Sequence, residues 1–277
     1  MTSTASPNGP TTPVAELAVI GGSGFYELLA DAERITVDTP YGAPSDALTL
    51  SEIDGRRVAF LPRHGSGHAV PPHRINYRAN LWALRSLGVR QILAPCAVGS
   101  LRPELGPGAV VVPDQLVDRT SGRTQTYYEE GAVHVSFADP YCAHGRQSVL
   151  EAAAATGTEA TDGGTMVVIQ GPRFSTRAES QWYAAAGWSL VNMTGHPEAV
   201  LARELALCYT AVALVTDHDA GIDTGQSVSQ EEVFRVFAQN TERLRALILE
   251  TLGRLPKERS CGCPDTLTDM NLPFPLP

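Results

Sequence analysis

The sequence predicts a single-domain α/β protein. A length of 277 residues is enough for about one large domain with a packed core. Short runs of Val, Ile, Leu and Ala alternate with segments of helical character, and this alternation favours an α/β fold. The apolar runs are nearly continuous, as strands covered on both faces of a sheet must be. We expect these strands at residues 17–20, 57–61, 91–94, 109–112, 165–169 and 209–216.

Helices are expected between the strands. The earlier ones are each followed by a glycine, which easily takes the left-handed conformation at a helix C-terminus. Thr176 with Glu179, and Ser229 with Glu232, form capping boxes that satisfy backbone donors at a helix start. Apolar side chains after Ser229 recur every three or four residues, so the last long helix should pack on the rest of the molecule. The earlier helices are expected at residues 75–87, 145–156 and 177–186.

The two ends of the chain differ in composition from the domain expected at residues 15–255. Residues 1–14 contain Ser, Thr and Pro without the basic and apolar segments of a signal or transit peptide, so we expect a disordered leader. Residues 256–277 are expected to form an extended tail rich in proline. For Cys261 and Cys263 in this tail, two reduced thiols on a flexible segment are favoured over a strained disulfide or a metal site.

Composition excludes several classes of partner. Thirty acidic residues against 21 basic ones give a net charge of −9, which disfavours nucleic acid as a partner. No apolar run approaches the ~20 residues that span a bilayer, so no membrane partner is expected. Five cysteines are an odd number in a long chain and do not suggest a secreted disulfide framework. We therefore expect a soluble cytoplasmic protein.

The first expected strand runs into a turn of small residues around Ser23 and Gly24. Backbone amides and the Ser23 hydroxyl could wrap an anion there. A dinucleotide fingerprint requires glycine three residues after Gly24, where Glu27 stands, and this speaks against nicotinamide binding. A simple turn and a phosphate site both remain open.

A second candidate segment follows the next expected strand. Arg63 stands at the strand end beside glycines, and its planar fork of donors suits the oxygens of phosphate. His64, His68 and His73 could be metal ligands, but no carboxylate or cysteine completes a set at a recognised spacing. We expect no metal at this site.

Three further segments stand where strands end. Cys96 lies in an apolar run and is interpreted as a small core residue rather than a nucleophile. Residues 170–176 and 191–198 each lead from a strand into a helix, the usual place for a ligand in an α/β sheet. Ordinary capping, with Phe174 and Met193 in the core, is the alternative.

Asp217 and Asp219 follow the last expected strand and alternate with His218. Two carboxylates at such positions point the same way from an extended chain. Because like charges repel in a dry site, at least one of them can hold a proton near neutral pH and serve as a general acid. Exposed turn aspartates are the alternative.

In this order, the segments resemble the trimeric purine nucleoside phosphorylase family, which includes the methylthioadenosine phosphorylases. The resemblance runs from about residue 18 to residue 252. It implies a single domain with a central mixed, partly barrel-like sheet flanked by helices, and a homotrimer or a pair of trimers. The segments that carry it are 20–24, 38–40, 44–46, 63–65, 76–80, 99–101, 118–120, 170–175, 192–194 and 216–219.

The resemblance also implies a reaction. Inorganic phosphate would attack the anomeric carbon of 5′-methylthioadenosine and release adenine and 5-methylthioribose 1-phosphate, a step of purine and methionine salvage. No metal or organic cofactor is implied. In the family, phosphate is held at the positions of Ser23, Arg63, His64, Cys96, Ala97 and Thr194, with Cys96 where a hydroxyl residue is common.

Substrate contacts follow in the same way. Phe174 would stack near the base, Asp217 would donate a proton to purine N7, and Asp219 would accept from a 6-amino group. Gln230 stands where methylthio-selective relatives tend to have an apolar residue, so adenosine is a possible substrate. The other positions that the family uses for the sugar and its 5′ side are Asn192, Met193, Val233 and, from a neighbouring subunit, His134.

Other functions remain open at this stage. A 6-oxopurine or general purine nucleoside phosphorylase would require Asp219 to be protonated or turned away from the base. A nucleosidase using water would leave the anion-binding residues without a ligand. A non-catalytic nucleoside-binding protein could share the fold, because fold does not fix function.

Overall fold

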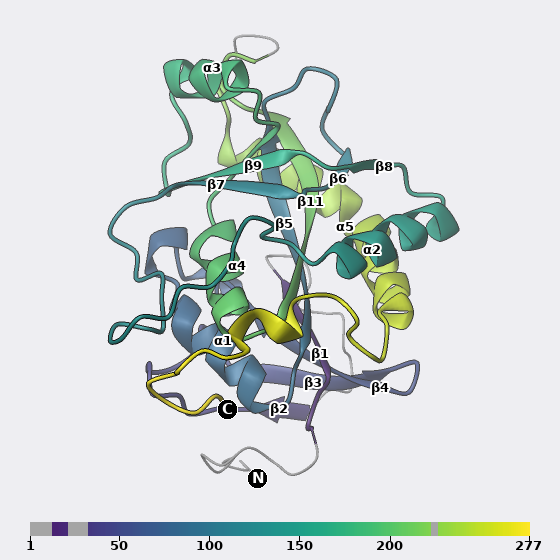
Figure 1. Cartoon of the computed structure of the whole chain (residues 1–277). Coiled ribbons are helices and arrows are strands. Elements are labelled where there is room, and N and C mark those ends of the chain that lie inside the picture. Colours follow the sequence, from purple (N-terminus) through teal and green to yellow (C-terminus); the bar gives the residue numbers. More distant parts are fainter. Residues whose placement is uncertain (1–12, 22–32, 223–226) are drawn as a thin grey trace.

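The fold is organised around strand β5 (Gln91–Ser100). The computed structural model describes residues 13–21, 33–222 and 227–277. β5 pairs in parallel along its length with β11 (Cys208–His218), and its first residues also pair in parallel with β1 (Leu17–Gly21). Its last residues pair antiparallel with β10 (Leu190–Asn192). Three neighbouring strands therefore meet at one strand (Figure 1).

Branches of the sheet leave β5 in different directions. One continues from β1 through β4, β3 and β2; another continues from β10 through β9 and β7; a third continues from β11 through β6 and β8. The sheet is mixed, with parallel and antiparallel pairs, as expected. The strands are β2 (Glu33–Ile35), β3 (Leu48–Ile53), β4 (Arg56–Pro62), β6 (Val110–Val112), β7 (Gln115–Arg119), β8 (Ala160–Asp162) and β9 (Thr165–Ile169).

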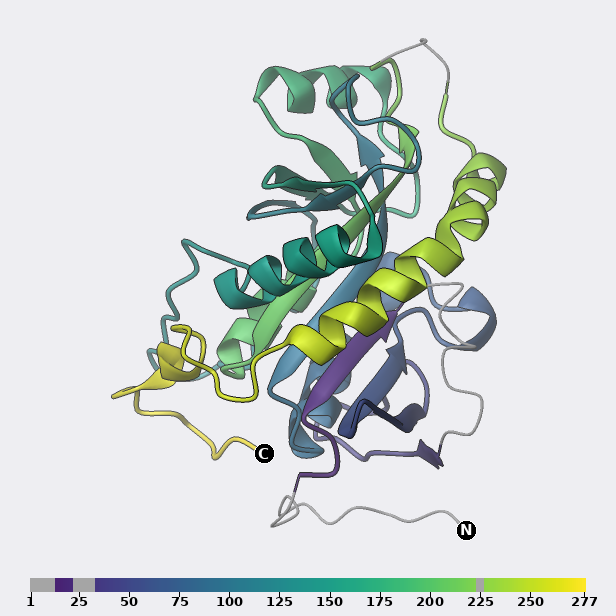
Figure 2. The ribbon, with the colours of Figure 1, turned by 90° about the vertical axis from the view of Figure 1, so that its right-hand side faces the viewer.

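Helices cover both faces of the sheet (Figure 2). On one face, α1 (Tyr77–Ser86) packs against α4 (Gly195–Glu204); on the other, α2 (Ala143–Thr156) packs against α5 (Gln230–Arg254). α3 (Arg177–Ala185) lies apart from these, beyond the strands β7 and β9 in Figure 1. Short 3₁₀ helices are η1 (Ser66–His68), η2 (Pro72–Arg74) and η3 (Pro264–Leu267).

Alternate residues of the central strands supply two separate apolar cores. Ala18 and Ile20 of β1 pack in the core under α1 and α4, whereas Leu17 and Val19 pack in the core under α2 and α5. All of these side chains are buried. Two covered faces explain why the strand sequences are continuously apolar, and the predicted α/β class is confirmed.

The expected elements are present, with shifted ends. The strand expected at residues 91–94 continues to Ser100, because its pairing with β11 runs past Pro95. Thr176 and Glu179 form the full capping box. Ser229 accepts the Glu232 amide as expected, but the Glu232 side chain binds Arg235 instead. The edge or short strands β2, β3, β7 and β8 were not predicted, because their few residues carry weak patterns. β10 was expected only as a strand end before the helix that follows residue 191.

The tail at residues 256–277 lies along the body of the protein. The Phe274 ring stacks on Tyr128 with a centroid separation of 5.4 Å, and it also contacts Trp82. Of the expected leader, residues 1–12 lie outside the described residues. Among the helices that the structure describes, none is both long and apolar enough to cross a membrane.

Packing of α5 on the sheet should contribute strongly to stability. Leu247 is fully buried in the core shared with α2, so Leu247→Ala is expected to lower the free energy of unfolding by about 2–5 kcal/mol in chemical denaturation. Glu242→Ala, at an exposed position of the same helix, is the control and should change it by less than about 0.5 kcal/mol. Equal effects of the two substitutions would contradict the assigned packing.

Candidate active site

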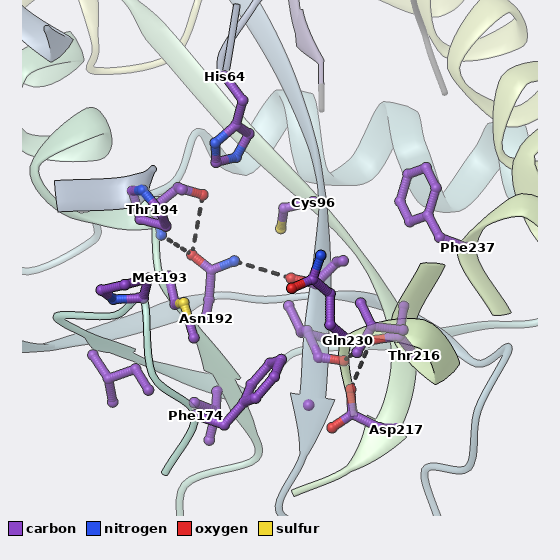
Figure 3. Close-up of a pocket in the computed structure, with 18 of the residues that line it drawn as sticks. His64, Cys96, Phe174, Asn192, Met193, Thr194, Thr216, Asp217, Gln230 and Phe237 are labelled. Carbon is purple, nitrogen blue, oxygen red and sulfur yellow. Dashed lines mark hydrogen bonds between the residues drawn. The ribbon is translucent and has the colours of Figure 1, made fainter. Parts of the chain in front are cut away.

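A cavity of about 360 Å³ lies between the ends of β5, β10 and β11 and the start of α5 (Figure 3). Its volume suits a small-molecule ligand. Most of the candidate residues line it, although they come from segments far apart in the sequence. These are Arg63, His64, Cys96, Ala97, Phe174, Asn192, Met193, Thr194, Asp217, Asp219, Gln230 and Val233.

The remaining candidates lie elsewhere. Ser23 lies outside the described residues. His134 is exposed and does not line the cavity of its own chain. His218, between the two aspartates, faces away from them, and its Nε2 donates to the Pro103 carbonyl at 3.2 Å.

A bulge in the sheet sets the direction of Asp217. β11 pairs with β5 without interruption up to Val215, and the register then shifts so that Asp217 lies opposite Gly99. Thr216 is the extra residue, and bulges of this kind re-aim side chains beside active sites. A Cβ on Gly99 would lie 3.0 Å from Asp217 Oδ2, so the bare backbone of Gly99 makes room for the carboxyl group.

Asp217 is arranged to hold a proton. Burial raises its pKa to about 6, and the nearby Asp219 and Glu232 carboxylates add to this shift, against the lowering effect of the Thr216 hydrogen bond. The Thr216 hydroxyl lies 2.8 Å from Asp217 Oδ1 and 3.2 Å from the Val98 carbonyl oxygen. One hydroxyl hydrogen cannot serve both acceptors. When Asp217 is protonated, its O–H can donate to Thr216, which then donates to Val98.

Asp219 is held by α3. The Ser180 hydroxyl of that helix donates to Asp219 Oδ2 at 2.7 Å, and both side chains are buried. The Asp219 amide donates to the Ser100 carbonyl at 2.8 Å. Asp219 also lines the cavity, so its other carboxylate oxygen can accept a hydrogen bond from a ligand.

His64 lies at the opposite end of the cavity from Phe174 and Asp217, beside Thr194 (Figure 3). Burial and the neighbouring Arg63 charge lower its pKa to about 3, so its ring is neutral near pH 7. Nδ1 lies 2.9 Å from the Val70 carbonyl oxygen, which can only accept. The ring hydrogen is therefore on Nδ1, and Nε2 is left as an acceptor.

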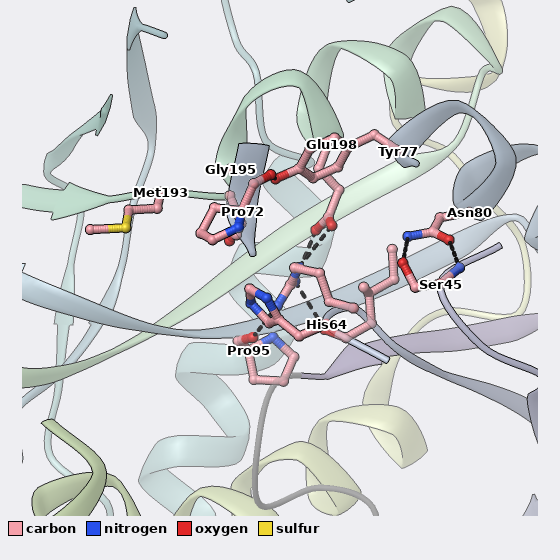
Figure 4. Close-up of polar contacts among 12 residues, drawn as sticks. Ser45, His64, Pro72, Tyr77, Asn80, Pro95, Met193, Gly195 and Glu198 are labelled. Atoms are coloured by element: carbon pink, nitrogen blue, oxygen red, sulfur yellow. Dashed lines mark hydrogen bonds and ion pairs between the residues drawn. The ribbon is translucent and has the colours of Figure 1, made fainter. Parts of the chain in front are cut away.

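Arg63 forms a buried ion pair at the same end. Its Nε and Nη2 each donate to one carboxylate oxygen of Glu198 at 2.8 Å, and both side chains are almost fully buried (Figure 4). Nη2 also donates to the Ile20 carbonyl and Nη1 to the Pro95 carbonyl. These contacts with described residues use four of the five N–H donors and leave one on Nη1 for the cavity.

The segment after β10 is folded by Asn192. Its Oδ1 accepts from the backbone amides of Thr194 and Gly195, and its Nδ2 donates to the Ala97 carbonyl at 3.1 Å. The buried Thr194 hydroxyl also donates to Asn192 Oδ1, over a long 3.4 Å, and lies at the cavity beside His64. Cys96 lies nearby, and burial raises the pKa of its thiol to about 12. A neutral thiol of this kind is a weak donor and a poor nucleophile.

The wall opposite Asn192 and Met193 comes from α5. Gln230 and Val233 of its first turn line the cavity together with Phe237 (Figure 3). Phe174, from the segment before α3, lies at the end that holds Asp217. The cavity thus has a polar end around His64 and Thr194, an acidic end around Asp217, and a largely apolar wall between them.

The sequence matches a known protein family. A sequence model of the Phosphorylase superfamily matches residues 16–253. The chain belongs to the phosphorylase superfamily.

Relatives within the superfamily carry different names. A purine nucleoside phosphorylase of Streptomyces coelicolor is 60% identical over 274 residues, which cover 95% of this chain and 98% of that protein. An S-methyl-5′-thioadenosine phosphorylase of Mycolicibacterium smegmatis is 59% identical over 262 residues, which cover 94% and 99%. Overall sequence identity therefore does not decide between these two kinds of phosphorylase.

Solved structures of the superfamily share the fold. A methylthioadenosine phosphorylase from an antarctic soil metagenomic library has a TM-score of 0.86 and 39% identity, over 93% of this chain and 92% of that chain. Methylthioadenosine phosphorylase from Schistosoma mansoni in complex with adenine has a TM-score of 0.85 and 37% identity, over 88% and 93%.

Three residues that line or support the cavity were given no site role from the sequence. Glu198, Thr216 and Phe237 were assigned only to a helix entry, a strand end and a core stripe. His196 Nε2 donates to Gln125 Oε1 at 2.7 Å, and the His196 ring does not line the cavity.

The raised pKa of Asp217 has a measurable effect on stability. Between its unfolded pKa of 3.8 and its folded pKa of about 6, the folded state binds more protons, so its ionisation destabilises the fold as the pH rises. Asp217→Asn removes this penalty. From about pH 4 to about pH 7, the variant should gain about 2–3 kcal/mol in free energy of unfolding relative to the wild type.

Chemical denaturation across this pH range measures the difference. Asp38→Asn, at an exposed carboxyl group, is the matched control and should show a much smaller change. A difference between Asp217→Asn and wild type that stays constant with pH would show that Asp217 is not held protonated.

Proposed function

We propose that this chain catalyses the phosphorolysis of 5′-methylthioadenosine to adenine and 5-methylthioribose 1-phosphate. The observation that carries this proposal is the presence of an aspartate with a pKa of about 6 in the same cavity as a set of anion-binding side chains. Cleavage of an N-glycosidic bond builds positive charge on the sugar and negative charge on the purine. A bound phosphate stabilises the first charge and a protonated carboxyl group the second.

Phosphate would bind at the polar end. The Thr194 hydroxyl and the remaining Arg63 N–H can donate there, beside Cys96 and Ala97. The family resemblance adds Ser23, which lies outside the described residues. His64 Nε2 is an acceptor, so it suits the O–H of a monohydrogen phosphate. Because Glu198 already neutralises Arg63, the site recognises phosphate mainly through hydrogen bonds.

The base would bind at the acidic end. Phe174 stacks on the purine, and Asp217 donates its proton to N7 as the glycosidic bond breaks. Asp219 Oδ1 accepts from the 6-amino group, since Oδ2 is already bonded to Ser180. Adenine is therefore preferred over hypoxanthine, whose carbonyl oxygen would face a carboxylate. Between the two ends, Asn192 and Met193 would lie against the sugar.

The 5′ substituent would meet the wall from α5. Val233 and Phe237 offer apolar surface to a methylthio group, whereas Gln230 can bind a 5′-hydroxyl group. Because two of these three side chains are apolar, the wall favours methylthioadenosine. Gln230 supports activity on adenosine as a second substrate. Relatives named as methylthioadenosine phosphorylases and as a purine nucleoside phosphorylase fit this dual chemistry.

The proposal extends to assembly and setting. The reaction requires no metal or organic cofactor, because phosphate itself is the nucleophile. A homotrimer would let the exposed His134 of one subunit reach the 5′ side of a neighbour's cavity. Five free cysteines suit a reducing compartment, in line with a cytoplasmic enzyme of purine and methionine salvage.

The test is to incubate the protein with methylthioadenosine, adenosine, methylthioinosine and inosine, each with and without phosphate, and to quantify the released base. Phosphate-dependent release of adenine, fastest from methylthioadenosine, is expected. Release of hypoxanthine alone would overturn the role of Asp219. Release of base at the same rate with and without phosphate would indicate a hydrolase. No release of base from any substrate would favour a binding protein.

Gly99 should be required for turnover although it has no side chain. In Gly99→Ala, the new methyl group would displace the Asp217 carboxyl group from N7, so kcat should fall by about 10²-fold or more with adenine nucleosides. Gly106→Ala is the control, because a Cβ there meets no atom within 4 Å. Near-normal kcat in a folded Gly99→Ala variant would remove the proposed role of this close approach.

Gln230 should set the preference at the 5′ position. Gln230→Leu is expected to lower kcat/KM for adenosine by about 10-fold or more and to leave methylthioadenosine nearly unaffected, which corresponds to about one lost hydrogen bond. Gln239→Leu makes the same change at an exposed position of α5 and should alter neither value. If the ratio of kcat/KM for adenosine to that for methylthioadenosine is unchanged in Gln230→Leu, this side chain does not recognise the 5′ substituent.

A further inference from the structure

Four cysteines gather at one point away from the active-site cavity. Cys142 stands at the N-cap of α2, Cys208 is the first residue of β11, and Cys261 and Cys263 belong to the C-terminal tail. Their sulfur atoms all lie within 4.8 Å of one another. The start of a helix, the start of a strand and the end of the chain thus converge on one small cluster of sulfur atoms.

The spacing of the sulfur atoms fits a tetrahedral metal site. Zinc binds thiolate sulfur at about 2.3 Å, which in a tetrahedron puts the sulfur atoms about 3.8 Å apart. Cys208 Sγ and Cys261 Sγ are 3.4 Å apart, and no two of the four sulfur atoms are more than 4.8 Å apart. Small shifts of the ligands, apart for this close pair and inward for any wider pair, would therefore complete the coordination.

The surroundings match a closed structural site. Cys142, Cys208 and Cys263 are buried with exposures of 2–4%, and only Cys261 is partly accessible. Four sulfur donors leave no open position for substrate, as in structural rather than catalytic zinc sites. Soft thiolates in tetrahedral geometry select Zn²⁺ over Mg²⁺ or Ca²⁺, which prefer oxygen.

Nearby positive charge would balance the complex. Zinc with four thiolates carries a net charge of −2. Arg259, two residues before Cys261, donates through Nη1 to the Ala206 carbonyl beside β11. Arg90, whose carbonyl accepts the Cys208 amide, donates in turn to the Arg85 carbonyl. The Arg85, Arg90 and Arg259 guanidinium groups are close enough to repel one another. An anionic complex near the start of β11 would offset this repulsion.

We propose that Cys142, Cys208, Cys261 and Cys263 bind one structural Zn²⁺ ion per chain, which fastens the C-terminal tail to the starts of α2 and β11. Each thiol releases its proton when the ion binds, and no oxidant or reductant takes part. The tail that follows carries η3 and Phe274, which packs on Tyr128 and Trp82. Metal binding therefore stabilises the contacts of the tail with the body.

Metal analysis of the purified full-length protein is the first test. Inductively coupled plasma mass spectrometry should find about one zinc per chain after dialysis without added metal. Cys261→Ser and Cys263→Ser should each lose most of it and lower the Tm. Cys96→Ser is the matched control, because it changes the only cysteine outside the cluster and should keep one zinc. Equal zinc in all variants would mean an adventitious ion and overturn the proposal.

Thiol counting on the wild-type protein separates a metal site from disulfides without relying on any variant. After denaturation with a chelator and without reductant, all five cysteines should react if the cluster holds zinc. One reactive thiol would mean two disulfides in place of the metal and would refute the site. Five reactive thiols without zinc would call for reconstitution with Co²⁺, and absence of the visible absorption of a tetrahedral thiolate complex would also refute it.

Discussion

The buried ion pair between Arg63 and Glu198 is the interaction on which the polar end of the cavity depends. It joins the end of β4 to α4, and the Arg63 guanidinium also holds the carbonyls of Ile20 and Pro95. Tyr209 of β11 donates to the same Glu198 carboxylate at 2.7 Å. Loss of one partner would leave a charge without compensation in the core, at a cost of about 3–5 kcal/mol. Arg63 is thus first a positioning group for the strands around the phosphate end, and only its last N–H is available to a ligand.

Strand β5 connects this end to the acidic end. Near the middle of β5, the Pro95 carbonyl accepts a hydrogen bond from Arg63. Near its end, Gly99 lies opposite Asp217, and the missing side chain of Gly99 leaves space for the Asp217 carboxyl group. One rigid strand thereby fixes the separation between the place for phosphate and the place for the purine. The reaction needs this, because its two charges develop together on the two sides of one bond. Buried apolar side chains on both faces of β5 hold it in place.

Much of the fold could be predicted from sequence because its central strands are buried on both faces and so are apolar throughout. The candidate site was also identifiable, since most of its residues follow strand ends in recognisable motifs. The partner of Arg63 was not identifiable, because Glu198 is 135 positions away and stands where helix entries commonly carry an acidic residue. Cys261-Gly-Cys263 was interpreted as part of a flexible tail, because its neighbours Cys142 and Cys208 are also far away in the sequence.

The most direct test of the central claim is to follow the phosphorus atom. ³¹P nuclear magnetic resonance of the protein with methylthioadenosine and inorganic phosphate, combined with quantification of adenine, shows where the phosphate goes. The account predicts one pentose 1-phosphate for each adenine released, with an equal loss of inorganic phosphate. Adenine released together with free methylthioribose, and no change in the phosphate signal, would contradict it.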